Sequence, residues 1–298
     1  MNNLEKGFLL LSSHLGDPER KPLTTAQLRA LADRMRQMEK PAEDRELERK
    51  DLLALGYNRE MADRILALLE DTPILEYYLQ KGSRTGCVPI TRVSPEYPVI
   101  LRQRLGLDSP GCLWIKGDAA LLRTPAIALV GSRDLAEPNR AFAAEVGRQA
   151  ATQGLTLISG NARGADRTAQ DACLAAGGKV ISVVADELSR QPLRENLLYV
   201  SEESFDEAFS SQRAISRNRV IHAMGWMTFV AQCSLGKGGT WDGTTKNLRF
   251  GWSPVACYRD GSEASAQLEQ MGAYLVDLED LHDVAPLLNI ECGLWGLL

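Results

Sequence analysis

Short apolar runs alternate with helix-like patterns along the second half of the chain. Phe142, Val146 and Ala150 fall on one helical face between two such runs, and a second face of this kind ends at Gly177 and Gly178. Apolar runs of this length are typical of buried parallel strands. The alternation predicts an α/β fold with a mostly parallel, doubly wound sheet and right-handed crossovers. The predicted strands are 126–130, 155–159, 179–185, 197–200, 227–231, 254–258 and 273–276.

The first part of the chain shows helical spacing only. Thr24 and Gln27 form a capping-box pattern, and Asn58 is placed to cap a further helix after a turn at Gly56. We predict a small all-α N-terminal domain over 1–85, a connector over 86–120 with a short strand, and the α/β domain over 121–298. Helix, Gly turn and helix resemble a DNA-binding helix-hairpin-helix unit, and a purely structural helical domain explains the same pattern.

The composition is that of an ordinary soluble protein. Of 298 residues, 24% are charged and 44% are hydrophobic. No apolar run approaches the length of a membrane span and no signal peptide is recognisable, so we expect a cytoplasmic protein with no membrane partner. The six cysteines form no CxxC pair, and His14, His222 and His282 are scattered. We therefore expect no metal site and no catalytic triad.

The net charge of −5 argues against a protein that coats nucleic acid nonspecifically. The distribution of the charges along the chain is more informative than their sum. Between residues 211 and 250 the cationic side chains outnumber the acidic ones, of which Asp242 is the only member. The stretch indicates either a basic patch or a solvated face. Its cationic residues are Arg213, Arg217, Arg219, Lys237, Lys246 and Arg249.

Two strand-to-helix turns carry the strongest candidate chemistry. The first offers Gly131, Ser132 and Arg133, with a glycine for close backbone approach, a hydroxyl and a guanidinium fork. The second turn, 159–166, has two glycines whose backbone N–H groups can converge on an anion, and an arginine between them that can neutralise it at the same sheet edge. Neither turn has the GxGxxG pattern of a dinucleotide-binding site, so we expect no dinucleotide. We predict no other cofactor either. The candidates in the second turn are Gly160, Arg163, Gly164 and Asp166, the last as a helix cap or as an orienter of Arg163 rather than a general base.

Two later segments add to this edge. Arg217, Asn218 and Arg219 open a predicted helix and can reach a phosphate backbone, or else form a salt-bridged helix start. A flexible, cationic loop follows over 234–244, without the order of a P-loop. Its candidate binding residues are Lys237, Gly238, Thr240 and Thr244. Trp241 in this loop either stacks on a base or packs in the core.

These four segments, in this order, resemble the DNA-processing protein A family (DprA, also called Smf). The match covers about 50–285 and includes Tyr97-Pro98 and the run 113–117. The resemblance implies an extended Rossmann-like domain that binds single-stranded DNA without catalysis, acts in DNA uptake or recombination, forms homodimers and assists loading of RecA. It places the DNA phosphate site at Gly131, Ser132, Arg133, Gly160, Arg163, Gly164, Arg217, Asn218 and Arg219, with Lys237 beside them.

The chain departs from the family pattern in three places. The loop 234–244 replaces an SGSLIT-type loop, and 185–190 replaces a Gly-x-Asp-x-x-Tyr-Pro turn. We also expect no C-terminal winged-helix-like domain, which many members carry. An alternative function is a nucleotide-binding sensor or a nucleotide N-glycosidase, because the segment 238–244 faintly resembles the loop of lysine-decarboxylase-like phosphoribohydrolases. That chemistry needs a glutamate soon after the loop, and none follows before Glu263.

Overall fold

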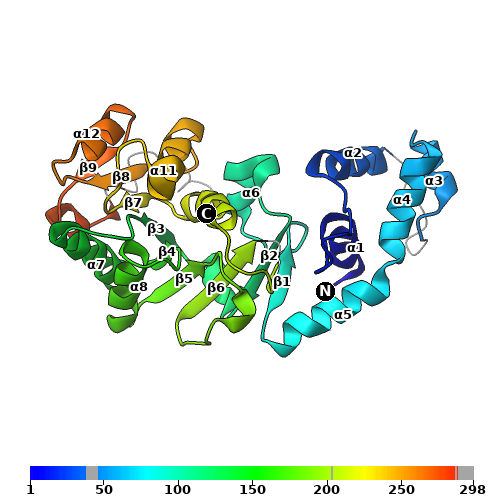
Figure 1. Ribbon diagram of the computed structural model, residues 1–298, viewed down its shortest axis with the longest axis horizontal. Coiled ribbons are helices and arrows are strands. Elements are labelled where there is room, and N and C mark those ends of the chain that lie inside the picture. The colour runs from blue at the N-terminus through cyan, green and yellow to red at the C-terminus, as the bar shows by residue number, and fades with distance from the viewer. Residues whose placement is uncertain (38–45, 203, 286, 288–298) are drawn as a thin grey trace.

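A nine-stranded sheet forms the centre of the protein (Figure 1). The computed structural model describes residues 1–37, 46–202, 204–285 and 287. The strand order is β1-β2-β6-β5-β4-β3-β7-β8-β9, and all pairs from β6 to β9 are parallel. The predicted α/β class with a mostly parallel sheet is confirmed. The parallel strands are β3 (Ala126–Val130), β4 (Thr156–Ser159), β5 (Lys179–Val183), β6 (Leu197–Glu202), β7 (Thr228–Val230), β8 (Val255–Tyr258) and β9 (Tyr274–Val276).

Two antiparallel strands extend the sheet at one edge. The predicted connector strand is β2 (Cys112–Lys116), and it pairs with β6 and with β1 (Val88–Thr91). Strand β1 was not predicted from the sequence, and Pro89 in so short a run is not typical of a strand. The structure puts it at the outer edge of the sheet, where a missing N–H donor costs least.

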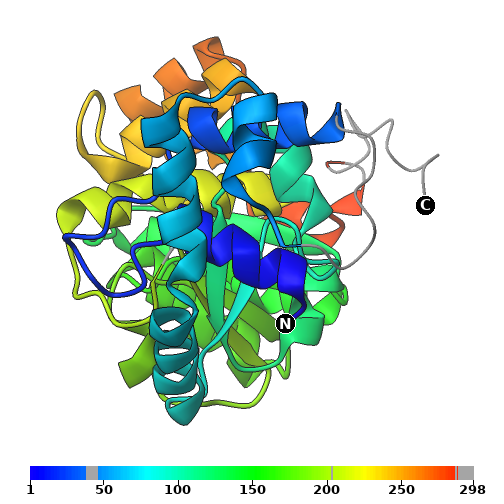
Figure 2. The ribbon, with the colours of Figure 1, turned by 90° about the vertical axis from the view of Figure 1, so that its right-hand side faces the viewer.

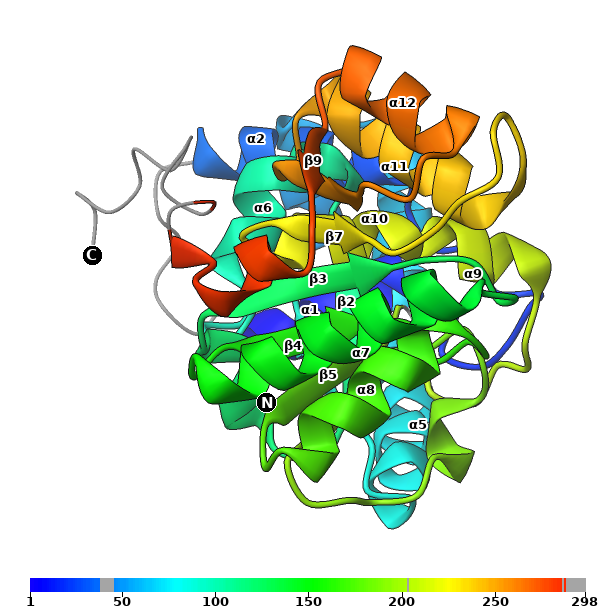
Figure 3. The same cartoon turned by 90° about the vertical axis from the view of Figure 1, so that its left-hand side faces the viewer.

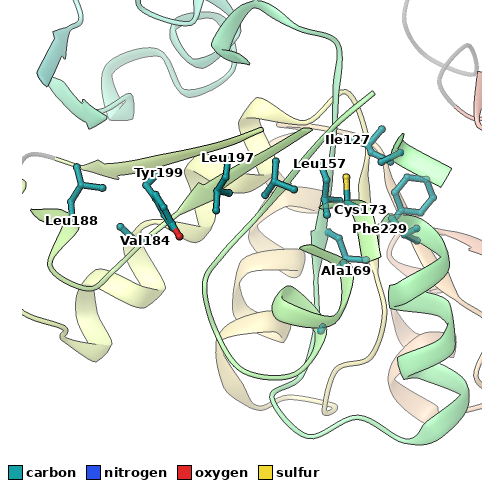
Figure 4. Close-up of a cluster of buried hydrophobic side chains, with 14 of the residues drawn as sticks. Ile127, Leu157, Ala169, Cys173, Val184, Leu188, Leu197, Tyr199 and Phe229 are labelled. Atoms are coloured by element: carbon teal, nitrogen blue, oxygen red, sulfur yellow. The ribbon is translucent and has the colours of Figure 1, made fainter. Parts of the chain in front are cut away.

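Helices cover both faces of the sheet. Helices α7 (Glu137–Thr152) and α8 (Ala165–Ala175) lie on one face, as Figure 3 shows. On that face Ile127, Leu157 and Phe229 of the strands pack around Ala169 and Cys173 of α8 (Figure 4). The opposite face is covered by α6 (Val99–Leu105), α10 (Asn218–Met224), α11 (Gly238–Phe250) and α12 (Glu263–Gln270).

The N-terminal region is helical, as predicted, and stands beside the antiparallel edge (Figure 1); in Figure 2 this region faces the viewer. Thr24 and Asn58 cap their helices through the side-chain bonds that the sequence indicated. The turn before Asn58 packs against α2, since Arg34 donates to the Leu55 carbonyl at 3.1 Å and lies over the Tyr57 ring. The helices are α1 (Asn3–Ser12), α2 (Thr25–Arg36), α3 (Arg49–Ala54), α4 (Arg59–Glu70) and α5 (Thr72–Arg84).

Polar and aromatic contacts join this region to the sheet. Tyr78 of α5 packs edge-on against Trp114 of β2, with ring centroids 5.4 Å apart. The Tyr78 hydroxyl donates to Asp206 at 3.0 Å, and Lys81 pairs with the same carboxylate at 2.6 Å. Short helical turns complete the fold: η1 (Gly106–Asp108), η2 (Ala119–Arg123), η3 (Leu188–Arg190), α9 (Ser211–Ser216) and η4 (Glu279–His282).

One predicted element is wrong. The segment 234–244 was expected to be a flexible loop because it is rich in glycine, a poor helix former. In the structure α11 begins at Gly238 and continues to Phe250. Thr244 and Asn247 on its inner side are fully buried against α10 and the sheet. Tertiary packing of that side outweighs the low helical propensity of the first turns.

Candidate phosphate-binding site

The two glycine turns predicted from the sequence meet at the carboxyl end of the sheet. The Ser132 N–H donates to the Gln232 carbonyl after β7 at 2.9 Å, and the Ala165 N–H donates to the Ser132 carbonyl at 3.1 Å. A Cβ on Gly131 would lie 2.5 Å from the Cβ of Ala165. Glycine at this position therefore lets the start of α8 approach the first turn closely.

Gly164 serves the same contact from the other side. Its φ of +87° is in the region that favours glycine, and a Cβ there would overlap the backbone of Arg133. The two turns are consequently locked to each other through backbone atoms. Their polar groups keep a fixed spacing at the sheet edge.

Arg217 is the central side chain of this edge. It lies between α9 and α10, is 8% exposed, and its Nε has no hydrogen-bond partner. Its Nη2 lies 3.7 Å from Oδ2 of Asp166, which is itself 5% exposed. A Cβ on Gly160 would overlap the guanidinium, so the glycine makes room for it. A buried guanidinium with donors left over is a strong site for an anion.

Asp166 holds this arginine in position. Its Oδ2 accepts the Ala162 N–H at 3.2 Å, and burial raises the pKa of Asp166 while the neighbouring Arg217 charge opposes the rise. The sequence suggested that Asp166 orients Arg163, but the structure pairs Asp166 with Arg217. Arg163 instead bonds Asp134 at 2.7 Å, and both side chains of that pair are largely exposed.

A cavity of about 360 Å³ opens over Arg217. Its walls come from both glycine turns, from the start of α10 and from the start of α11. The Thr240 hydroxyl donates to the Gly131 carbonyl at 2.9 Å, which ties α11 to the first turn. Predicted site residues that line the cavity are Gly131, Ser132, Arg133, Asp166, Arg217, Asn218, Lys237, Gly238 and Thr240.

A smaller cavity of about 200 Å³ adjoins the first and shares Arg133 and Arg217 with it. Arg163 lines this second space together with Phe209, whose side chain is 52% exposed. Phe209 is not among the residues predicted from the sequence for this site. An aromatic in a polar stretch before the arginine-rich helix was the available signal, because an exposed aromatic beside arginines can stack on a base.

Besides Gly160, Arg163 and Gly164, two further predicted residues do not line the cavity over Arg217. Arg219 points to the other side of α10, where it pairs with Glu202 at 2.7 Å and donates to the Asp108 carbonyl at 3.1 Å. Thr244 is fully buried within α11. Trp241 is partly buried and packs against the core, as one of its two interpretations proposed.

His222 is a fully buried histidine on α10. Burial lowers the pKa of His222 to about 3, and its Nδ1 lies 3.2 Å from the Thr228 hydroxyl. Asp242, the acidic residue inside the segment 238–244, pairs with Lys246 at 2.8 Å and does not line the cavity over Arg217. Within the described residues no three acidic, histidine or cysteine side chains are grouped to hold a metal, and no helix is long and apolar enough to cross a membrane.

The fold and this site define a Rossmann-like α/β protein with a buried arginine in a cavity at the carboxyl edge of its sheet, the edge where open α/β sheets bind ligands. The family model described as DNA recombination-mediator protein A matches residues 89–286, more than half of the chain. The chain belongs to this family, and the resemblance seen in its motifs is confirmed.

Curated relatives include DNA processing protein DprA of Streptococcus pneumoniae, 29% identical over 182 residues, which are 57% of this chain and 64% of the relative. Protein Smf of Escherichia coli is 28% identical over 142 residues, 44% of this chain and 38% of the relative. The chain thus matches less than two thirds of the length of either relative.

Solved structures agree on the fold. The X-ray structure of DprA from S. pneumoniae superposes with a TM-score of 0.72 at 24% identity, over 94% of this chain and 98% of that one. DprA from Helicobacter pylori superposes with a TM-score of 0.55 at 21% identity, over 68% of this chain and 94% of that one.

Proposed function

We propose that this protein binds single-stranded DNA in the cavity over Arg217 and acts, without catalysis, in DNA recombination or uptake. The observation that carries the proposal is the buried Arg217 guanidinium, which has an unpaired Nε and lines a cavity together with Arg133 and Lys237. Support comes from the family, described as recombination mediators, and from the H. pylori DprA, which binds single-stranded DNA.

The residues of the two cavities match the parts of a nucleotide strand. A phosphate on Arg217 gains charge-assisted hydrogen bonds in a desolvated place, with Arg133 and Lys237 at the rim. Phe209 in the adjoining cavity offers an exposed ring for a base. Stacking needs unpaired bases, so we expect the single strand to bind more tightly than the duplex.

Fluorescence anisotropy with a labelled single strand, its duplex and a mononucleotide, over a salt series, tests the proposal. We expect tight, salt-sensitive binding of the single strand, and Arg133→Ala should weaken it and reduce the salt slope by about 1. Arg49→Ala on α3, an exposed arginine paired with Asp63, is the matched control. No binding of any strand at low salt, or release of a free base from the mononucleotide, would refute the proposal.

We further propose that the protein forms a homodimer and assists loading of RecA onto the bound strand. These steps fit the description of the family as recombination mediators. Sedimentation velocity across protein concentrations tests the dimer. The rate at which RecA assembles on a labelled strand, with and without this protein, tests the loading, and an unchanged rate would count against it.

A further inference from the structure

A third cavity, of about 400 Å³, lies beside the phosphate-binding cavity and on the other side of Asn218. Asn218 and Ile215 line both spaces, so the two cavities adjoin at the start of α10. The N-terminal helical region contributes to this cavity through Thr25, the first residue of α2. Other lining residues are Ser109, Ser216, Gly243, Lys246 and Trp252.

The charges around this cavity do not suit a phosphate. Arg219 is paired with Glu202, and Lys246 with Asp242, which leaves Asp108 as a further acid in the lining. No buried guanidinium with spare donors lines it, in contrast to the cavity over Arg217. A phosphate would meet a neutral to slightly acidic surface here and would gain little attraction.

An uncharged planar heterocycle suits it better. Trp252 forms an aromatic wall, half-buried and held in place by stacking on Phe250 with ring centroids 5.6 Å apart. The Ser109 hydroxyl donates to the Gly106 carbonyl at 2.8 Å and can still accept, while the Ser216 hydroxyl accepts from Arg219 and can still donate. The Asn218 amide nitrogen donates to the Gly239 carbonyl at 3.1 Å, which leaves its oxygen as an acceptor. The volume is within the range of small-molecule pockets.

We propose that this cavity, the base cavity, holds a nucleobase of the DNA strand whose neighbouring phosphate lies on Arg217. The inference rests on the proposed function, and it adds a second base position at the junction of the N-terminal region with the α/β part. The strand passes Asn218 between the two cavities. The helical N-terminal region is then part of the DNA-binding surface rather than only a structural attachment.

Oligonucleotides that carry a single abasic site, moved along the strand, test the inference. An abasic site keeps the phosphate and removes the base. We expect one position, distinct from the one sensitive to Phe209→Ala, at which the abasic site weakens binding roughly 5- to 150-fold. At that position Trp252→Leu and the abasic site should not add, because both remove the same contact.

Thr25 gives a second variant that does not touch the core. Thr25→Glu places a carboxylate at the first turn of α2, where it favours the helix, and there it should repel the strand. We expect weaker binding of a long strand but unchanged binding of a trinucleotide that fills only the cavity over Arg217, with Thr25→Gln as the neutral control.

The outcomes separate the inference from the proposed function. If the unmodified protein binds no single strand, the proposed function fails. If it binds, but Trp252→Leu and every abasic position add independently and Thr25→Glu binds like Thr25→Gln, the base cavity is refuted while the phosphate site stands.

Discussion

The substitution Gly160→Ala isolates the role of Arg217. Gly160 follows β4 directly, and its φ is not in the left-handed region, so an alanine can adopt the backbone. Its Cβ, however, would occupy the space of the Arg217 guanidinium. The guanidinium is the far end of a flexible side chain, and we expect it to move while the sheet keeps its structure.

The size of the effect follows from the contacts that are lost. A hydrogen bond to a charged group contributes about 1.5–3 kcal/mol, so the dissociation constant for single-stranded DNA should rise about 10- to 150-fold. Displacement also takes the cation away from Asp166, 3.7 Å from it in a buried place. Breaking a buried pair outright costs about 3–5 kcal/mol, and a smaller loss of stability is expected here because the guanidinium is displaced rather than deleted and can be solvated in its new position.

Anisotropy titration at fixed salt measures the affinity, and urea unfolding measures the stability. Gly7→Ala on α1 is the control, because a Cβ there meets only Leu69, at 4.0 Å. If Gly160→Ala kept its affinity for the strand, while a structure of the variant showed the guanidinium displaced, Arg217 would not be the phosphate ligand and the reasoning would be wrong.

Three further outcomes are expected. Gly147→Ala places a Cβ against the carbonyl of Ala169 where α7 and α8 cross, so the free energy of unfolding, measured in urea, should fall by about 1–3 kcal/mol. An unchanged free energy of unfolding would contradict the close crossing. His222 has a folded pKa of about 3, below its unfolded value, so at low pH the unfolded chain binds a proton that the folded protein does not. The free energy of unfolding should therefore be at its full value above pH 6.5 and fall by roughly 3 kcal/mol toward pH 4.5. His222→Asn should flatten this dependence in urea unfolding at several pH values. Arg163→Ala breaks only an exposed pair with Asp134, so the free energy of unfolding should change by less than about 1 kcal/mol. The salt dependence of DNA binding should become less steep, and an equal salt dependence in the variant and the unmodified protein would exclude Arg163 from the DNA contact.

The hydrophobic pattern was sufficient to predict a strand where the residues of that pattern are also the ones buried in the folded protein. The run 126–130 was predicted as a strand at its observed bounds, because all five residues are buried between two layers of helices. The end of each predicted parallel strand was within two residues of the observed one, and the glycine turns that follow were located with it. The segment 234–244 was mistaken for a loop, because propensity carries no information about the partner that buries Thr244.

The candidate site also combines features that the sequence predicts with features that only packing decides. Arg217 and Arg219 are equivalent in the sequence, two arginines around one asparagine, and both were proposed for the phosphate site. A helix turns about 100° per residue, so residues two apart point to different sides. Only the packing of α10 decides that Arg217 faces Gly160 and Asp166 while Arg219 faces Glu202.

The amino-acid sequence by itself determined the α/β class, the helical N-terminal region and the glycine turns with their cationic residues. These follow from periodicity and from backbone conformations that few residues can adopt, and such signals are local in the chain. The tertiary structure decided which arginine is buried, which acid holds it, and that Thr25, Asn218 and Trp252 border one cavity. Those facts depend on contacts between segments far apart in the chain, and only the folded arrangement of the sheet and its helices brings them together.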